Sequence, residues 1–127
     1  MEEIKVNEYV RTKEGYIARF IHYGINEGIN GKSCLFDKAI RDISCLIYDE
    51  DNFLFDSELK KYIVKHSPNI IDLIEEEDIA VLNCYGFKVK KIVKQDDILE
   101  LKLGNYELLE ILTKEQYNQM KYIVGGE

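Results

Sequence analysis

Tryptophan is absent from this 127-residue sequence, proline occurs once, and histidine occurs only as His22 and His66. The three cysteines, Cys34, Cys45 and Cys84, form no CxxC pair and stand among apolar neighbours. They predict reduced core residues and argue against a disulfide framework or a zinc site. No apolar run approaches the roughly 20 residues of a membrane-spanning helix. Disulfide-stapled, zinc-ribbon and membrane-spanning classes are therefore not expected.

Catalytic motifs are also missing: the sequence has no P-loop, dinucleotide fingerprint, HExxH or GxSxG pattern. Two arrangements come closest to a catalytic group: His66 with Ser67 and Asp72, and His22 with Cys34 or Cys45. We expect neither to be catalytic, because lone strand cysteines usually fill cores and His66 adjoins a predicted helix start. The sequence therefore predicts a protein that is not an enzyme.

Metal and cofactor sites find little support. The polar run at residues 49–52 has some likeness to a calcium loop, but it lacks the glycine and the bidentate glutamate of an EF-hand. We interpret it as a solvated turn. No metal and no cofactor are expected.

Negative charge is in excess: 24 acidic residues against 17 basic ones give a net charge of −7. This balance argues against general affinity for nucleic acid, which needs phosphate neutralisation, and permits binding to a basic protein surface. Three acidic clusters, all expected to face water, are the candidate partner-binding residues: Glu75, Glu76, Glu77 and Asp78; Asp49, Glu50 and Asp51; Asp96 and Asp97.

The first residues and the cysteine content bear on location. The opening Met1-Glu2-Glu3 is acidic and no apolar segment follows it, so no secretory signal is expected. Unpaired cysteines are typical of a reducing compartment. We expect a cytoplasmic protein without membrane association.

Short alternating segments separated by polar turns dominate the chain, and 46% hydrophobic residues are enough for a core. Strands are predicted at residues 4–12, 16–23, 32–36, 45–48, 53–55, 63–64, 79–82, 87–94, 98–103 and 106–112. Residues 24–31 are predicted to be a loop, residues 95–97 a turn and residues 57–62 a helical turn, while residues 37–44 are ambiguous.

Two short helices are predicted from capping signals. Ser67 is placed as an N-cap with Pro68 at the first helical position, followed by an apolar stripe from which Asp72 points away. Near the end, Thr113 and Gln116 have the spacing of a capping box, with Tyr117, Met120 and Tyr122 as apolar contacts.

The predicted fold is mainly β with short helices (α+β), built as two small SH3-like or open-barrel β units in tandem, each closed by a short helix. The first unit spans residues 1–66, the short helix and acidic hinge 67–78, and the second unit 79–127. Residues 15–21 and 86–92 share a glycine, an aromatic, a small apolar residue, a basic residue and an isoleucine. This match indicates a degenerate tandem duplication, with chance as the competing explanation.

Lys88, Lys90 and Lys94 lie on one face of a predicted strand, with Lys91 opposite. Together with the nine tyrosines of the chain, they would suit stacking of single-stranded nucleic acid. Exposed tyrosines equally suit a protein interface, which we favour because nearby acidic residues dilute the positive field.

The segments 8–18, 64–75 and 112–117 resemble a group of small prophage and mobile-element proteins of Firmicutes, clostridia especially. Residues 77–83 depart from that group, and residues 24–61 are not covered. The resemblance implies a phage accessory protein that acts in the host cytoplasm by binding and inhibiting a host protein, such as a CRISPR nuclease or another defence protein. A nucleic-acid-binding regulatory module is the alternative, and a structural phage component is a third.

Overall fold

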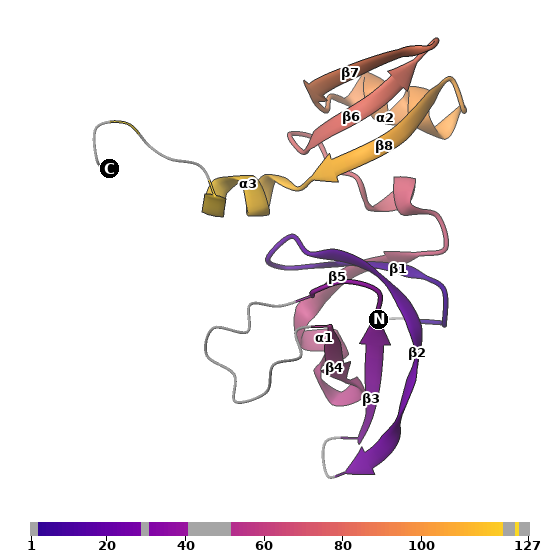
Figure 1. Cartoon of the computed structure of the whole chain (residues 1–127), viewed down its shortest axis with the longest axis vertical. Coiled ribbons are helices and arrows are strands. Elements are labelled where there is room, and N and C mark those ends of the chain that lie inside the picture. Colours follow the sequence, from indigo (N-terminus) through magenta and orange to yellow (C-terminus); the bar gives the residue numbers. More distant parts are fainter. Residues whose placement is uncertain (1–2, 29–30, 41–51, 121–123, 125–127) are drawn as a thin grey trace. The chain divides into compact units, whose positions relative to one another are not determined.

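A computed structural model describes residues 3–28, 31–40, 52–120 and 124 of the chain. The chain divides into two compact units, Met1–Leu73 and Ile74–Glu127, which we call unit 1 and unit 2. Both contain an antiparallel sheet and short helices, so the predicted mainly β, α+β class is confirmed. The sheets are open, and the strands within the described ranges close no barrel (Figure 1). The division falls inside the predicted linking segment 67–78.

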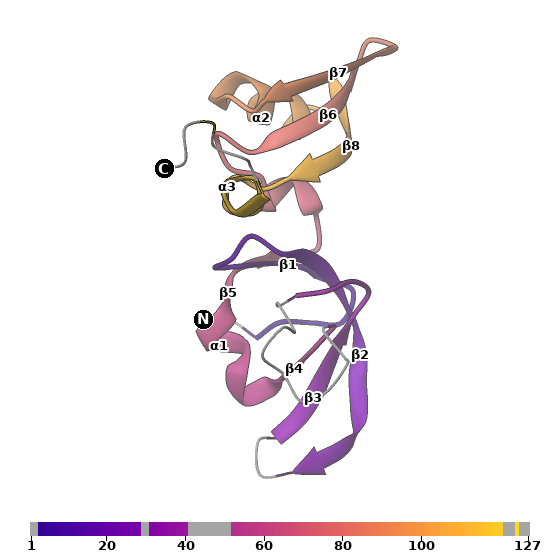
Figure 2. The same cartoon turned by 60° about the vertical axis from the view of Figure 1, so that its left-hand side comes forward.

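The sheet of unit 1 has five strands in the order β4-β3-β2-β1-β5 (Figures 1 and 2). Their bounds are β1 Tyr9–Thr12, β2 Ile17–Gly28, β3 Gly31–Phe36, β4 Phe53–Phe55 and β5 Ile63–Ser67. The predicted hairpin is confirmed: β1 and β2 pair antiparallel, and Thr12 N–H donates to Tyr16 O at 2.9 Å across the turn. Gly15 adopts a φ of 87°, which favours glycine in that turn.

The prediction of a loop at residues 24–31 is wrong for residues 24–28 and 31, which lie in strands, while residues 29–30 lie outside the described residues. Strand β2 continues to Gly28, which pairs with Gly31 at the start of β3. Gly24 lies opposite Ser33, and a Cβ at position 24 would overlap the Ser33 hydroxyl. A glycine that suggested a turn therefore serves a close approach between two strands.

The core of unit 1 lies on one face of this sheet. Alternating side chains from all five strands enter it, and helix α1 (Leu59–Tyr62), which follows the 3₁₀ helix η1 (Asp56–Glu58), adds Leu59 and Tyr62 at its margin. These two helices confirm the predicted helical turn at residues 57–62. The buried apolar members are Ile4, Val10, Ala18, Phe20, Cys34, Phe36, Ile40, Leu54 and Ile63.

The 3₁₀ helix η2 (Ile70–Leu73) follows β5 and contacts β1. Its start differs from the prediction: Asn69 Oδ1 accepts the Ile71 N–H at 3.1 Å, so the cap lies two residues after Ser67. The Ser67 hydroxyl instead accepts the Asn69 N–H and donates to Asp72 at 2.5 Å. Asp72 therefore turns back toward the chain, because its carboxylate is the acceptor that this hydroxyl needs.

Unit 2 has a three-stranded sheet in the order β7-β6-β8, formed by β6 Ile79–Cys84, β7 Phe87–Ile92 and β8 Tyr106–Leu112. The β6–β7 turn consists of Tyr85 and Gly86, which have φ values of 53° and 92°. Two successive positive φ angles match the right-handed twist of the flanking strands. Asn83 Oδ1 accepts the Gly86 N–H at 2.9 Å and stabilises this turn.

Helix α2 (Gln95–Lys102) replaces the predicted turn at 95–97 and strand at 98–103, so both predictions are wrong. The apolar residues do alternate, but the segment consists of good helix formers with acidic residues in the first turn. Asp97 Oδ2 accepts the Lys94 N–H at 2.9 Å, and Leu101 is buried. Gly104, with a φ of 82°, ends the helix and donates to Leu101 O at 3.1 Å.

Helix α3 (Lys114–Met120) starts as predicted, because Thr113 Oγ1 accepts the Gln116 N–H at 3.3 Å. Its predicted apolar contacts are not confirmed: Tyr117 is partly exposed and Met120 largely so. The described part of α3 spans seven residues, too few for a full apolar stripe. The predictions for residues 41–51 and for Tyr122 lie outside the described residues.

The two units open with the same turn. In unit 1, Lys5 N–H donates to Glu8 Oε1 at 2.7 Å, and Glu8 N–H donates to Lys5 O at 3.0 Å. In unit 2, Glu75 N–H donates to Asp78 Oδ2 at 2.9 Å, and Asp78 N–H donates to Glu75 O at 3.2 Å. The third residue of each turn has a positive φ, which is 75° at Asn7 and 77° at Glu77.

The strands that follow repeat as well. Phe20 N–H donates to Glu8 O at 2.8 Å, and Val93 N–H donates to Asp78 O at the same distance. Each unit then orders three strands alike, as β2-β1-β5 and as β7-β6-β8, with a helix before the third strand and a helix after it. These shared bonds favour the tandem duplication over chance.

Candidate functional site

The acidic clusters do not behave as one kind of surface. Asp78 is 0% exposed, and its carboxylate accepts the Glu75 and Lys114 N–H groups at 2.9 Å each. Glu75 lies 2.9 Å from Lys114 Nζ and raises the pKa of that ammonium. Glu76 and Glu77 are exposed. In this cluster, the prediction that all four residues face water is therefore wrong for Asp78, which the backbone needs as an acceptor.

The cluster at Asp96 and Asp97 divides in the same way. Asp96 is exposed, whereas Asp97 is only 4% exposed and binds Lys91 Nζ at 2.9 Å, which raises the pKa of Lys91. The Asp97 carboxylate thus caps the N-terminus of α2 and is too buried to contact a partner. Asp49, Glu50 and Asp51 lie outside the described residues. Glu76, Glu77 and Asp96 remain as exposed acidic candidates.

The His66 arrangement and the pair of His22 with Cys34 are not assembled, and Cys45 lies outside the described residues. His66 Nδ1 lies 3.2 Å from Glu8 Oε1, while the Ser67 hydroxyl donates to Asp72. Neighbouring residues of a strand point to opposite faces, so His66 cannot activate Ser67. His22 Nδ1 lies 2.9 Å from Tyr23 O, and the cross-strand partner of Cys34 is Tyr23.

Cys34 has the environment of a core thiol. It is 0% exposed, and burial, with a smaller effect from the Asp56 charge, raises its pKa from 9.0 to about 11. An activated nucleophile needs the opposite shift. Within the described residues there is no group of three or more histidine, cysteine, aspartate or glutamate side chains that could hold a metal ion.

The raised pKa of Cys34 predicts a loss of stability in alkali. Its contribution is complete below about pH 9 and disappears as the pH rises through about 11, because the unfolded chain ionises first. We expect unit 1 of the parent to lose about 1–3 kcal/mol more than Cys34→Ala over this range, as measured by urea unfolding. If the unfolding free energies of the parent and of Cys34→Ala changed equally with pH, the raised pKa of Cys34 would be refuted.

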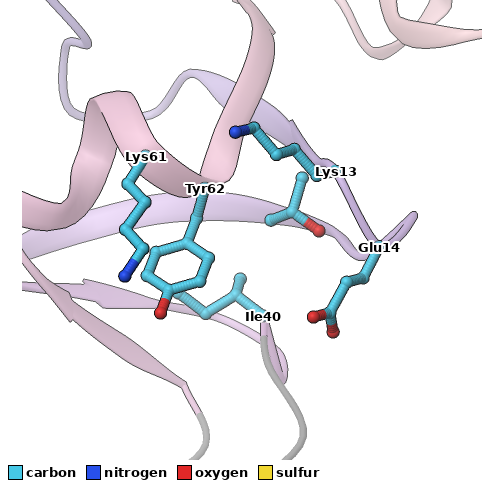
Figure 3. A pocket seen from close by; sticks show the side chains of 6 residues that line it. Lys13, Glu14, Ile40, Lys61 and Tyr62 are labelled. Atoms are coloured by element: carbon cyan, nitrogen blue, oxygen red, sulfur yellow. The ribbon is translucent and has the colours of Figure 1, made fainter.

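A cavity of about 150 Å³ lies beside α1 (Figure 3). Tyr62 and Ile40 form its floor, and Lys13, Glu14 and Lys61 surround it (Figure 3). Lys61 Nζ lies 5.3 Å from the Tyr62 ring centroid. Both partners of this cation–π contact line the cavity, and the geometry indicates a surface depression of unit 1.

An aromatic group at the end of the unit 2 sheet was missed by sequence reasoning. Tyr85 and Phe87 are 75% and 74% exposed, and the Tyr85 ring meets that of Tyr106 edge-on, with centroids 6.0 Å apart. Phe87 and Tyr106 both pair with Cys84, so they share a face of the sheet. We call Tyr85, Phe87 and Tyr106 the aromatic tip. The signal for it was the Tyr-Gly-Phe sequence across a hairpin turn.

Comparisons with family models, with curated proteins and with solved structures find no match to this chain. The resemblance to prophage proteins therefore stays a prediction. Within the described residues, none of the helices has the length and apolar character needed to cross a membrane.

Proposed function

We propose that this chain is a non-catalytic protein-binding protein of phage origin that acts in the host cytoplasm. Its partner in this proposal is a host defence protein such as a CRISPR nuclease. The observation that carries the binding function is the aromatic tip. The resemblance of residues 8–18, 64–75 and 112–117 to prophage proteins supports the choice of partner.

The aromatic tip has the properties of a binding anchor. Tyrosine and phenylalanine bury about 150–250 Å² each, and tyrosine is enriched among the residues that dominate binding energy. Tyr85 holds a φ of 53°, a conformation that costs a non-glycine residue roughly 1–2 kcal/mol. The Asn83–Gly86 hydrogen bond keeps this turn in place, so the two exposed rings are presented on a rigid hairpin.

The binding function predicts loss of partner capture when the aromatic tip is removed. We expect Tyr85→Ser with Phe87→Ser to weaken capture at least about tenfold, because each exposed ring contributes on the order of 1 kcal/mol or more at an interface. To measure capture, the tagged chain is incubated with a nuclease-treated lysate of a host that carries the defence protein, and the recovered proteins are quantified by mass spectrometry. Met120→Ser, which changes an exposed apolar residue on α3, serves as control and is expected to retain capture.

Two results would contradict parts of this proposal. Equal capture by the parent and the double variant would remove the aromatic tip from the interface. Reversing the charges of Glu76, Glu77 and Asp96 tests whether acidic groups occupy a basic groove of the target. Undiminished capture by that triple variant would show that these carboxylates occupy no such groove.

A nucleic-acid-binding module is the second candidate, supported by exposed Lys88 and Lys90 and by the exposed rings at the tip of the same hairpin. The same face of the sheet carries Glu107 and Glu110, each in register with one of these lysines two strands away. Those carboxylates oppose phosphate, which is why we place this function second. Oligonucleotide binding that falls steeply with salt would reverse the order.

A further inference from the structure

The duplicated units differ at one edge of their sheets. In unit 1, Arg19 N–H donates to Asp37 Oδ1 at 2.7 Å and Arg19 O accepts the Asp37 N–H at 3.0 Å. Strand β3 pairs with the rest of β2, from Phe20 to Gly28. The outer edge of β2 is therefore covered by the unit's own chain.

Strand β7 holds the equivalent position in unit 2, and within the described residues it pairs with β6 alone. Val93 bonds to the β6 side, since its N–H donates to Asp78 O at 2.8 Å and its carbonyl accepts the Glu77 N–H at 2.9 Å. Backbone groups of alternate residues point to opposite sides of an antiparallel strand. Lys88, Lys90 and Ile92 consequently direct their N–H and C=O groups outward, and we call these groups the β7 edge.

The side chains beside the β7 edge specify the chemistry of a strand that would fit it. Lys88 and Lys90 lie on one face, and Phe87 and Val89 lie on the other, all exposed. Lys91 is already neutralised by Asp97. A strand with carboxylates at alternate positions would place them opposite the two lysines and its apolar residues beside the ring.

We propose that the β7 edge accepts an extended segment of the partner protein as a further antiparallel strand, in which acidic residues alternate with apolar ones. This inference rests on the proposed protein-binding function and names its mode of recognition. A second copy of this chain fits less well, because antiparallel pairing of two β7 strands would bring lysines against lysines.

Hydrogen exchange of the full chain tests the proposal, with a peptide of alternating glutamate and valine as the probe. In the free chain, the amides of Lys88, Lys90 and Ile92 are expected to exchange faster than those of Val89 and Lys91. Millimolar probe is expected to slow the three outward amides by at least about tenfold, since each gains a hydrogen bond. No slowing, slowing at another surface, or an equal effect from a lysine–valine peptide would overturn the proposal.

Charge reversal provides the matched test. Lys88→Glu with Lys90→Glu is expected to weaken probe binding about tenfold, whereas Lys102→Glu, an exposed lysine on α2, retains it. Dimerisation at the β7 edge, seen by sedimentation, would overturn the choice of occupant. Partner capture separates this inference from the proposed function. Capture lost only in the tip variant rejects the β7 edge alone. Capture retained in both variants rejects the aromatic tip and the β7 edge as binding surfaces, whereas no capture by the parent chain rejects the proposed function.

Discussion

Unit 2 is expected to lose about 3–5 kcal/mol of unfolding free energy when Asp78 is replaced by alanine. The Asp78 side chain is 0% exposed and accepts the N–H groups of Glu75 and Lys114, at 2.9 Å each. These bonds join the opening turn of the unit to the start of α3. Alanine would leave two N–H groups without their acceptor in a buried site, where each costs about 1–3 kcal/mol.

Urea unfolding, followed through NMR signals of unit 2, measures this effect. Asp78→Asn keeps the size of the side chain but supplies one acceptor oxygen, so an intermediate loss of about 2 kcal/mol is expected. Glu76→Ala lies in the same turn with an exposed side chain and is expected to stay within about 0.5 kcal/mol of the parent. A small loss for Asp78→Ala, equal to that of Glu76→Ala, would show that Asp78 does not hold the unit together.

Unit 1 is expected to depend as strongly on Arg11, which is 1% exposed on the central part of its sheet. Val10 enters the core from β1, so Arg11 points to the opposite face, where η2 contacts β1. Its Nη1 donates to Leu73 O at 2.9 Å. Arg11→Ala removes this charged donor and leaves a void, and we expect a loss of about 3–5 kcal/mol.

Two variants separate the charge of Arg11 from its volume. Arg11→Met fills most of the space and removes a buried charge, so we expect a smaller loss of about 1–2 kcal/mol. Arg19→Ala changes an exposed arginine on the neighbouring strand and should alter stability by less than about 0.5 kcal/mol. Equal losses for Arg11→Ala and Arg19→Ala would refute the structural role of Arg11.

The hairpins and most strands followed from local chemistry. Gly15 and Gly86 stand where the chain reverses, and Thr113 caps a helix from its own side chain. Such signals act over a few residues, so the sequence alone carries them. The prediction of a strand at 98–103 was wrong because apolar residues that alternate over a short run also fit one face of a helix. Leu101, which is buried on α2, is one of these residues.

The candidate site was less accessible to sequence reasoning. Acidic residues in a run look alike, yet Asp78 and Asp97 are buried acceptors while Glu76, Glu77 and Asp96 are exposed. The difference arises from backbone N–H groups that the fold brings near them. The β7 edge was invisible for a related reason, since a strand becomes an edge only through the pairing of the whole sheet.

The sequence by itself determined the class of this protein: an acidic, mainly β chain with hairpin turns and helix caps encoded by neighbouring residues. Tertiary structure alone decided which charges are structural, which rings stay exposed and which strands lie at the edges of the described sheets. The physical reason is the distance along the chain over which each interaction acts, because the hydrogen bonds of turns and caps form within a few residues. Burial and strand pairing join segments far apart in the chain, such as Asp78 with Lys114 and Arg11 with Leu73.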